Sequence, residues 1–167
     1  MTQTREMRRK EKSVSDPEEI RAILDKSAIC RLGFSQGGTP YVLPLNYGYT
    51  YIDGVITVFI HGAGEGRKMD IIGQNPIVCF EIDCEQRLDP ETNPNRYAFI
   101  WESIVGTGTV EFVTDLNEKK QIISNIINKY LKHNPHYHTE VTDVRIQGTT
   151  VLKLRLDEFK AKRIIHD

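Results

Sequence analysis

The sequence is poor in cysteine, has no long apolar run and carries a net charge of only −1. Its three cysteines are odd in number and lack Cys-x-x-Cys spacing, so no disulfide framework is expected. Cys30 and Cys79 lie in apolar stretches and are predicted to be buried thiols. No run approaches the roughly 18 apolar residues of a membrane span, and the charged N-terminus is unlike a signal peptide. The 22 basic and 23 acidic side chains leave no surplus for nucleic acid. We therefore expect a cytoplasmic protein that binds neither membranes nor nucleic acids.

Several functional motifs are missing as well. The sequence has no P-loop. It also lacks the dinucleotide-binding Gly-x-Gly-x-x-Gly motif, because Arg67 stands where the last glycine would fall, and the absence of this motif opposes a Rossmann fold. No Gly-x-Ser-x-Gly elbow supports serine hydrolase chemistry. His133, His136 and His138 crowd one segment, for which a solvated loop is favoured over a metal site. No metal cofactor is predicted.

The length of 167 residues suits one domain. We assign residues 1–15 to an N-terminal basic arm and residues 16–167 to a single domain. The arm mixes both charge signs, which favours a solvated terminus or a strand-like arm over a partner subunit rather than a phosphate-binding tail.

Capping boxes predict two helices. Asp16, Pro17 and Glu19 begin a helix that should fade near Lys26. Asp115 and Glu118 begin a longer one, in which Ile122, Ile123, Ile126, Ile127, Tyr130 and Leu131 form one apolar stripe. A short helix is expected after Gly66.

Between the helices the pattern changes to that of strands. Strands are predicted over 28–34, 41–51, 55–60, 77–82, 97–113 and 151–156, with a polar loop over 84–96. Pro44 marks an edge or a bulge, and Gly106 and Gly108 bend the long strand. Strands joined by hairpins, with few helices, predict a mainly β fold: an antiparallel barrel whose openings the helices cover.

A glycine-rich segment with two cations follows the third strand. Gly62, Gly64 and Gly66 expose backbone amides, and Arg67 and Lys68 begin the short helix, where free N–H groups favour an anion. These parts suit a phosphate monoester, and the alternative is a solvated turn with two surface cations.

Three other side chains are candidates for a cofactor site. His61 can contact a cofactor ring or donate a proton, or simply cap the strand. Trp101 and Tyr47 can stack on a planar ring, although a core position is the alternative for each.

The segments that carry a family resemblance are 31–34 (RLGF), 40–48 (PYVLPLNYG), 59–63 (FIHGA), 66–68 (GRK) and 75–81 (NPIVCFE). In this order they resemble the nitroimidazole-resistance branch of the pyridoxamine 5'-phosphate oxidase-like flavoproteins, over roughly residues 7–165. The resemblance implies a six-stranded antiparallel split β-barrel of Greek-key type. It also implies a homodimer that holds FMN at its interface.

The resemblance further implies roles for single residues. The isoalloxazine would be lined, largely by backbone groups, by Leu43, Pro44, Leu45, Asn46 and Tyr47. The ring or ribityl chain would lie beside His61, Gly62 and Ala63, and the phosphate beside Gly66, Arg67 and Lys68. The partner subunit would close the site with Trp101, Ser103 and Val105.

The resemblance, together with the position of His61, implies an FMN-dependent oxidoreductase that reduces small flat molecules such as nitroimidazoles, with His61 as a candidate proton donor. Vitamin B6 oxidation is not expected, because residues 159–167 lack the Arg-Leu-x-Pro-type element of the true oxidases. The alternative is a carrier or sensor that binds FMN or haem without turnover.

Overall fold

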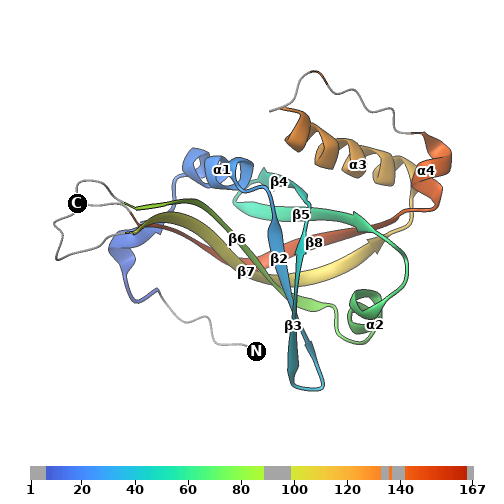
Figure 1. Cartoon of the computed structure of the whole chain (residues 1–167), viewed down its shortest axis with the longest axis horizontal. Coiled ribbons are helices and arrows are strands. Elements are labelled where there is room, and N and C mark those ends of the chain that lie inside the picture. The colour runs from blue at the N-terminus through green and yellow to red at the C-terminus, as the bar shows by residue number, and fades with distance from the viewer. Residues whose placement is uncertain (1–6, 89–98, 133–135, 137–141, 165–167) are drawn as a thin grey trace.

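The computed structural model of the chain describes residues 7–88, 99–132, 136 and 142–164. Within these residues, eight strands form one curved antiparallel sheet, with α1 and α3 on the same side of it and α2 at the opposite side (Figure 1). The strands are β1 (Ser13–Val14), β2 (Cys30–Gln36), β3 (Thr39–Leu45), β4 (Gly48–Ile52), β5 (Val55–Gly62), β6 (Ile77–Leu88), β7 (Phe99–Val113) and β8 (Thr150–Ile164). Their order in the sheet is β3-β2-β6-β7-β8-β5-β4, and β1 pairs with β8.

The predicted fold class, a mainly β antiparallel barrel with flanking helices, is confirmed. The number of strands differs, since the described residues form eight rather than six. The stretch predicted as one strand over 41–51 divides at Asn46 and Tyr47 into β3 and β4. The short β1 lies inside the predicted basic arm, where Ser13 pairs with Lys162 and Val14 packs into the core.

Two strands run further than their apolar patterns indicate. β6 continues to Leu88, into the predicted polar loop, and β8 continues to Ile164. The extra length of β6 pairs with β7 across an irregularity between Cys84 and Arg87, where Glu85 has a φ of 58°. Charged residues are tolerated there because backbone pairing does not require a buried face.

The described helices are the 3₁₀ turn η1 (Lys10–Lys12), α1 (Pro17–Lys26), α2 (Arg67–Gln74), α3 (Leu116–Leu131) and α4 (Asp143–Gln147). The two helices predicted from capping residues, α1 and α3, begin where expected. The Asp16 carboxylate accepts from the N–H groups of Glu18 and Glu19 at 2.9 and 3.1 Å, and Asp115 accepts from Glu118 at 2.8 Å. The Glu19 side chain binds Arg163 on β8 at 2.7 Å rather than closing a capping box.

The main core is formed by the strands with the buried faces of α1 and α2, and a smaller apolar cluster includes Ile122 and Ile126 of α3. The largest fully buried side chains of the main core include Tyr47, Phe80, Leu24, Leu32, Ile104 and Leu152. β7 bends sharply over it at Gly108, where an added Cβ would lie 2.1 Å from the Arg155 carbonyl oxygen. The register between β7 and β8 shifts at the same place, which confirms the predicted bend.

Candidate functional site

The predicted phosphate site forms where β5 ends and α2 begins. His61 and Gly62 close β5, paired with Val151 and Thr150 of β8. Gly66 is the N-cap of α2, with a φ of 106° that only glycine adopts readily. Its carbonyl accepts from the N–H groups of Met69 and Asp70 at 2.8 and 3.2 Å. The N–H groups of the first two helical residues, Arg67 and Lys68, therefore have no acceptor within the helix.

The glycines of this segment leave room that a side chain would fill. A Cβ on Gly62 would lie 3.2 Å from the Lys68 Nζ, and a Cβ on Gly64 would lie 2.9 Å from the Thr150 Oγ1. The Lys68 ammonium therefore occupies the space beside bare backbone at the end of β5. We call the segment from Gly62 to Lys68 the β5–α2 cradle.

The β2–β3 hairpin positions Arg67. The Arg67 guanidinium lies over the Tyr41 ring, 4.4 Å from its centroid, and its Nε donates to the Gln36 Oε1 at 3.3 Å. Sequence reasoning missed Gln36 and Tyr41 as parts of this site. Both lie at least 26 residues from Arg67 in the chain, and no local pattern links them to it.

The pKa values of Lys68 and His61 are both lowered in the cradle. Burial lowers the pKa of Lys68. Burial, and then the Lys68 cation, lower the pKa of His61 below its ordinary value of 6.5. An anion placed beside these two groups would relieve both effects, because it favours their charged forms.

These observations fit a phosphate monoester, and with it FMN. Such a group needs close backbone approach, free helical N–H groups and cations that are not already paired with carboxylates. The cradle supplies all three. Arg67 is exposed, as in a solvated turn, but its guanidinium is held by two contacts with the β2–β3 hairpin.

The side chains of the segment predicted to line the isoalloxazine differ in their exposure to solvent. Leu43 and Leu45 are half-buried against the core, whereas Pro44 and Asn46 are exposed. Because β3 is at the edge of the described sheet, alternate backbone groups of this strand face away from β2.

Tyr47 belongs to the core. Its hydroxyl donates to the Leu24 carbonyl at 2.7 Å, and its N–H donates to the Tyr130 hydroxyl at 2.9 Å. The alternative of a buried core aromatic therefore holds for this side chain. A cofactor contact at Tyr47 would have to use its carbonyl group.

Within a single chain, Trp101 and Ser103 lie far from His61. Val151 pairs with both His61 and Val113, so His61 lies level with the end of β7. Trp101 lies twelve residues away from Val113, about 40 Å along the strand at ~3.3 Å per residue. Ser103 is buried, and the Lys162 ammonium covers the Trp101 ring at 5.0 Å. A role for these residues at the site would therefore require a partner subunit, as the sequence analysis expects.

Val105 lies closer to the predicted isoalloxazine segment. It pairs with Glu81, which pairs with Arg31, which pairs with Pro44, so these residues form one row across four strands. Ala63, the remaining predicted contact, is exposed in the cradle.

Other sequence predictions have separate outcomes. Cys30 is buried as expected, but the prediction is wrong for Cys79, whose side chain points to the outer face of β6 and is exposed. His133 and His138 lie outside the described residues. The part of the chain that the structure describes holds no group of three or more His, Cys, Asp or Glu side chains suited to a metal ion. Over the same part, no helix has the length and apolarity needed to cross a bilayer.

Comparison with known proteins adds family and fold. The family model for pyridoxamine 5'-phosphate oxidase matches residues 16–163. No match was found among curated proteins. A candidate 5-nitroimidazole antibiotic resistance protein from Bacteroides thetaiotaomicron is 26% identical, with 90% of this chain and 86% of that chain covered and a TM-score of 0.77.

Two further solved structures share the fold at lower identity. A flavocytochrome from Azotobacter vinelandii is 20% identical, with 99% of this chain and 75% of that chain covered and a TM-score of 0.76. An FAD and heme binding protein from Mycobacterium smegmatis is 15% identical, with 93% and 74% covered and a TM-score of 0.77.

Proposed function

The chain belongs to the pyridoxamine 5'-phosphate oxidase family, and on this premise we propose that it is an FMN-binding oxidoreductase. The observation that carries the proposal is the β5–α2 cradle, where Arg67 and Lys68 stand beside bare backbone and free N–H groups. Two neighbours with the same fold are a flavocytochrome and a protein that binds FAD and heme, which supports a redox cofactor in this architecture.

FMN is the form of flavin that the cradle suits best. FMN ends in a phosphate monoester with two negative charges, and two cations at one helix N-terminus match that group. The absorption spectrum of the purified protein and the mass of the released cofactor test this assignment. Flavin bands with the mass of FMN would support it, whereas the mass of FAD, or a haem Soret band, would contradict it.

When bound, FMN would supply the redox chemistry, and the chain would supply binding, orientation and a proton. Arg67 and Lys68 would hold the phosphate, and the open backbone edge of β3 would orient the ring. His61, at the end of β5, would hold the proton at its imidazole. A candidate 5-nitroimidazole resistance protein at 26% identity supports flat nitroaromatic compounds as substrates. A reduced holoprotein that a 5-nitroimidazole oxidises no faster than free reduced FMN would exclude this activity and favour a carrier.

His61 provides a prediction with a pH readout. In the flavin-free protein, NMR titration should give His61 a pKa below 6.5, because desolvation and the Lys68 cation both disfavour the imidazolium. Inorganic phosphate in the cradle should raise that pKa, since it offsets the Lys68 charge.

The same residue should control the rate of substrate reduction. As a proton donor His61 must be protonated, so oxidation of the reduced holoprotein should slow as the pH rises through the His61 pKa. His61→Asn should be about 10²-fold slower at the acidic end and should lose this dependence. A variant that keeps the wild-type pH profile would remove His61 from the proton transfer.

We infer that the chain forms a homodimer through the outer face of β3, β2, β6 and β7. Val42, Ile77 and Val105 point to this face and are 59%, 57% and 45% exposed. In the centre of the face, Arg31 is paired with Glu81 and Asp83. Exposed apolar side chains on a common face are typical of a protein interface. A second chain docked there could also bring Trp101 and Ser103 to the cradle.

Light scattering tests the dimer. The wild-type protein should have twice the chain mass, and Val105→Asp should shift it toward the monomer because a carboxylate would be buried in the interface. Val144→Asp is the matched control, since Val144 on α4 is 82% exposed and away from this face. A wild-type protein that stays monomeric at high concentration would contradict the inference.

A further inference from the structure

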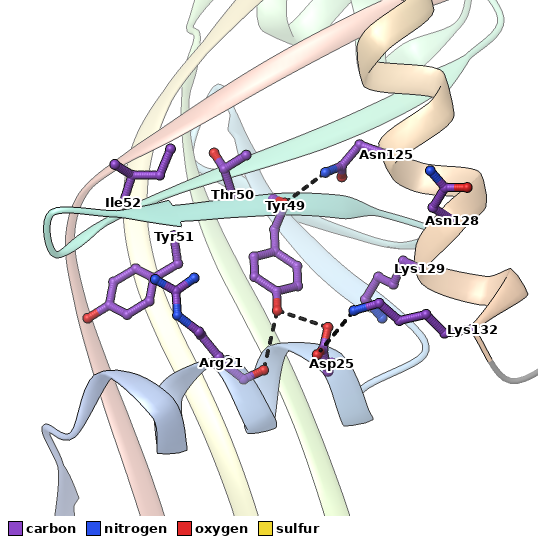
Figure 2. Close-up of a pocket in the computed structure, with 10 residues that line it drawn as sticks. All are labelled: Arg21, Asp25, Tyr49, Thr50, Tyr51, Ile52, Asn125, Asn128, Lys129 and Lys132. Atoms are coloured by element: carbon purple, nitrogen blue, oxygen red, sulfur yellow. Dashed lines mark hydrogen bonds and ion pairs between the residues drawn. The ribbon is translucent and has the colours of Figure 1, made fainter.

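A second cavity lies between α1, β4 and α3, apart from the β5–α2 cradle. Its volume is about 340 Å³, which is within the range of small-molecule sites. Its walls come from α1 at Arg21 and Asp25, from β4 at residues 49–52, and from α3 at residues 125–132 (Figure 2). No sequence motif pointed to it, because the three elements meet only in the folded chain.

The cavity carries more positive than negative charge. Arg21, Lys129 and Lys132 line it, against the single carboxylate of Asp25. That carboxylate is engaged, since it accepts from the Tyr49 hydroxyl at 2.9 Å and lies 3.5 Å from the Lys132 Nζ. Figure 2 shows Arg21 and Lys132 on either side of the Tyr49 ring. An anion between them would meet a cation from each helix.

Lys129 adds a cation that is buried without an ion pair. It is 7% exposed, and its Nζ donates to the Ser27 carbonyl at 2.5 Å and lies 4.4 Å from the centroid of the Tyr47 ring. None of the described carboxylates forms an ion pair with it. Burial accordingly lowers the pKa of Lys129. The Asp25 carboxylate offsets only part of this effect, and an anion in the cavity would add to its attraction for the buried charge.

Other donors around the cavity also have capacity left. The Arg21 guanidinium lies 3.5 Å from the Glu18 carboxylate and 5.0 Å from the Tyr51 ring centroid, contacts that do not use its full fork of donors. The Asn128 side chain is exposed and lines the cavity, so its amide is accessible to a ligand.

We propose that this cavity binds a small organic anion. Its carboxylate or phosphate lies between Arg21 and Lys132, and its flat body rests against the Tyr49 ring. The proposal does not depend on the proposed flavin chemistry, because none of these residues belongs to the cradle. A site here would be a ligand site separate from the β5–α2 cradle.

Calorimetric titration of the full chain tests the site with matched probes. Benzoate and phenyl phosphate are the anions, and benzamide and phenol are their neutral counterparts. The background is Arg67→Gln with Lys68→Gln, so that the cradle does not bind the anions. We expect the anions to bind with a Kd at or below about 1 mM and the neutral probes at least about tenfold more weakly.

Variants locate the binding. Arg21→Gln with Lys132→Gln should weaken anion binding by about tenfold or more. Lys120→Gln is the control, because Lys120 lies on the same helix but pairs with Asp143 at 2.7 Å outside the cavity. Asn128→Tyr should reduce binding of every probe by filling the space, with circular dichroism to establish that the variant folds.

Three results would overturn the proposal. The first is that the protein with an unaltered cavity binds no anion at millimolar concentration. The second is equal affinity for the charged and the neutral probes. The third is unchanged anion affinity in the Arg21 and Lys132 double variant.

Discussion

Replacing Arg67 and Lys68 together with glutamine is expected to weaken FMN binding by roughly 10²–10⁴-fold. Each cation would lose a charge-assisted hydrogen bond to the phosphate, and such bonds contribute about 1.5–3 kcal/mol each. The first residues of α2 keep their backbone geometry, so the helix N-terminus still attracts the phosphate and some affinity should remain. Titration of the flavin-free variant with FMN, followed by the quenching of flavin fluorescence, measures the change.

A matched double variant separates this effect from a general loss of charge. Lys120→Gln with Arg155→Gln removes the half-buried Lys120 of α3 and the exposed Arg155 of β8, neither of which belongs to the cradle. Its affinity for FMN should equal that of the wild-type protein within about twofold, because screening weakens distant surface charges. If the Arg67 and Lys68 variant binds FMN as well as this control does, the phosphate lies elsewhere and the proposed function loses its main support.

Tyr41 extends the same prediction to a residue that would not touch the cofactor. Tyr41→Leu removes the ring under the Arg67 guanidinium, and a cation–π contact contributes about 0.5–2 kcal/mol. We therefore expect a loss of affinity between about twofold and thirtyfold, smaller than that of the cradle variant. Tyr41→Phe keeps the ring and should bind FMN like the wild-type protein. Equal losses in both variants would point to the hydroxyl instead.

The parts of the fold that could be predicted from the sequence are those that local chemistry specifies. Asp16 and Asp115 cap helices through hydrogen bonds within three residues, so the starts of α1 and α3 follow from the sequence alone. The long apolar strands and the glycine bend in β7 were also predictable. In each case the sequence pattern lies in the same few residues as the structural feature that it predicts.

The parts that could not be predicted depend on contacts between distant segments. β3 and β4 separate because Tyr47 turns into the core and binds the Leu24 carbonyl of α1, more than twenty residues earlier. β1 is a strand only because β8 runs far enough to pair with it. In a two-residue strand the sequence pattern is too short to be informative.

The candidate site divides in the same way. The glycines and the two cations of the cradle are adjacent in the chain, so their spacing predicted an anion site before any fold was known. The positioning of Arg67 by Gln36 and Tyr41 needs the β2–β3 hairpin, and the α1–β4–α3 cavity needs three elements at once. Trp101 and Ser103 cannot be assigned within one chain, because the register of β7 and β8 separates them from His61.

A charged network beneath α1 should contribute strongly to stability. The Glu102 side chain on β7 is almost fully buried and accepts from Lys26 at 3.0 Å and from Arg163 at 2.5 Å. Arg163 also binds Glu19 at 2.7 Å, so one network ties α1 to β7 and β8. Cys84 lies against it, with its Sγ 3.7 Å from Glu102, and burial with this carboxylate raises the pKa of the thiol to about 12.

Glu102→Ala is expected to lower the free energy of unfolding by about 3 kcal/mol, because it removes the buried carboxylate that Lys26 and Arg163 share and leaves Arg163 with Glu19 alone. Glu111→Gln is the control on the same strand, since Glu111 is exposed and 3.9 Å from Lys153, and it should cost less than about 0.5 kcal/mol. Denaturant unfolding at fixed protein concentration measures both. Similar losses in the two variants would show that the network is not stabilising.

The pH dependence gives this prediction a second readout. Burial alone would raise the pKa of Glu102, but the hydrogen bonds from Lys26 and Arg163 outweigh it and hold the pKa below the ordinary value of 4.5. The folded state therefore binds this proton less readily than the unfolded chain does. The stabilisation is fully present above pH 4.5 and is lost as the pH falls through the lower, folded pKa. The difference between the wild-type protein and Glu102→Gln should accordingly shrink on acidification, whereas a difference that stays constant would mean that packing, not charge, makes Glu102 important.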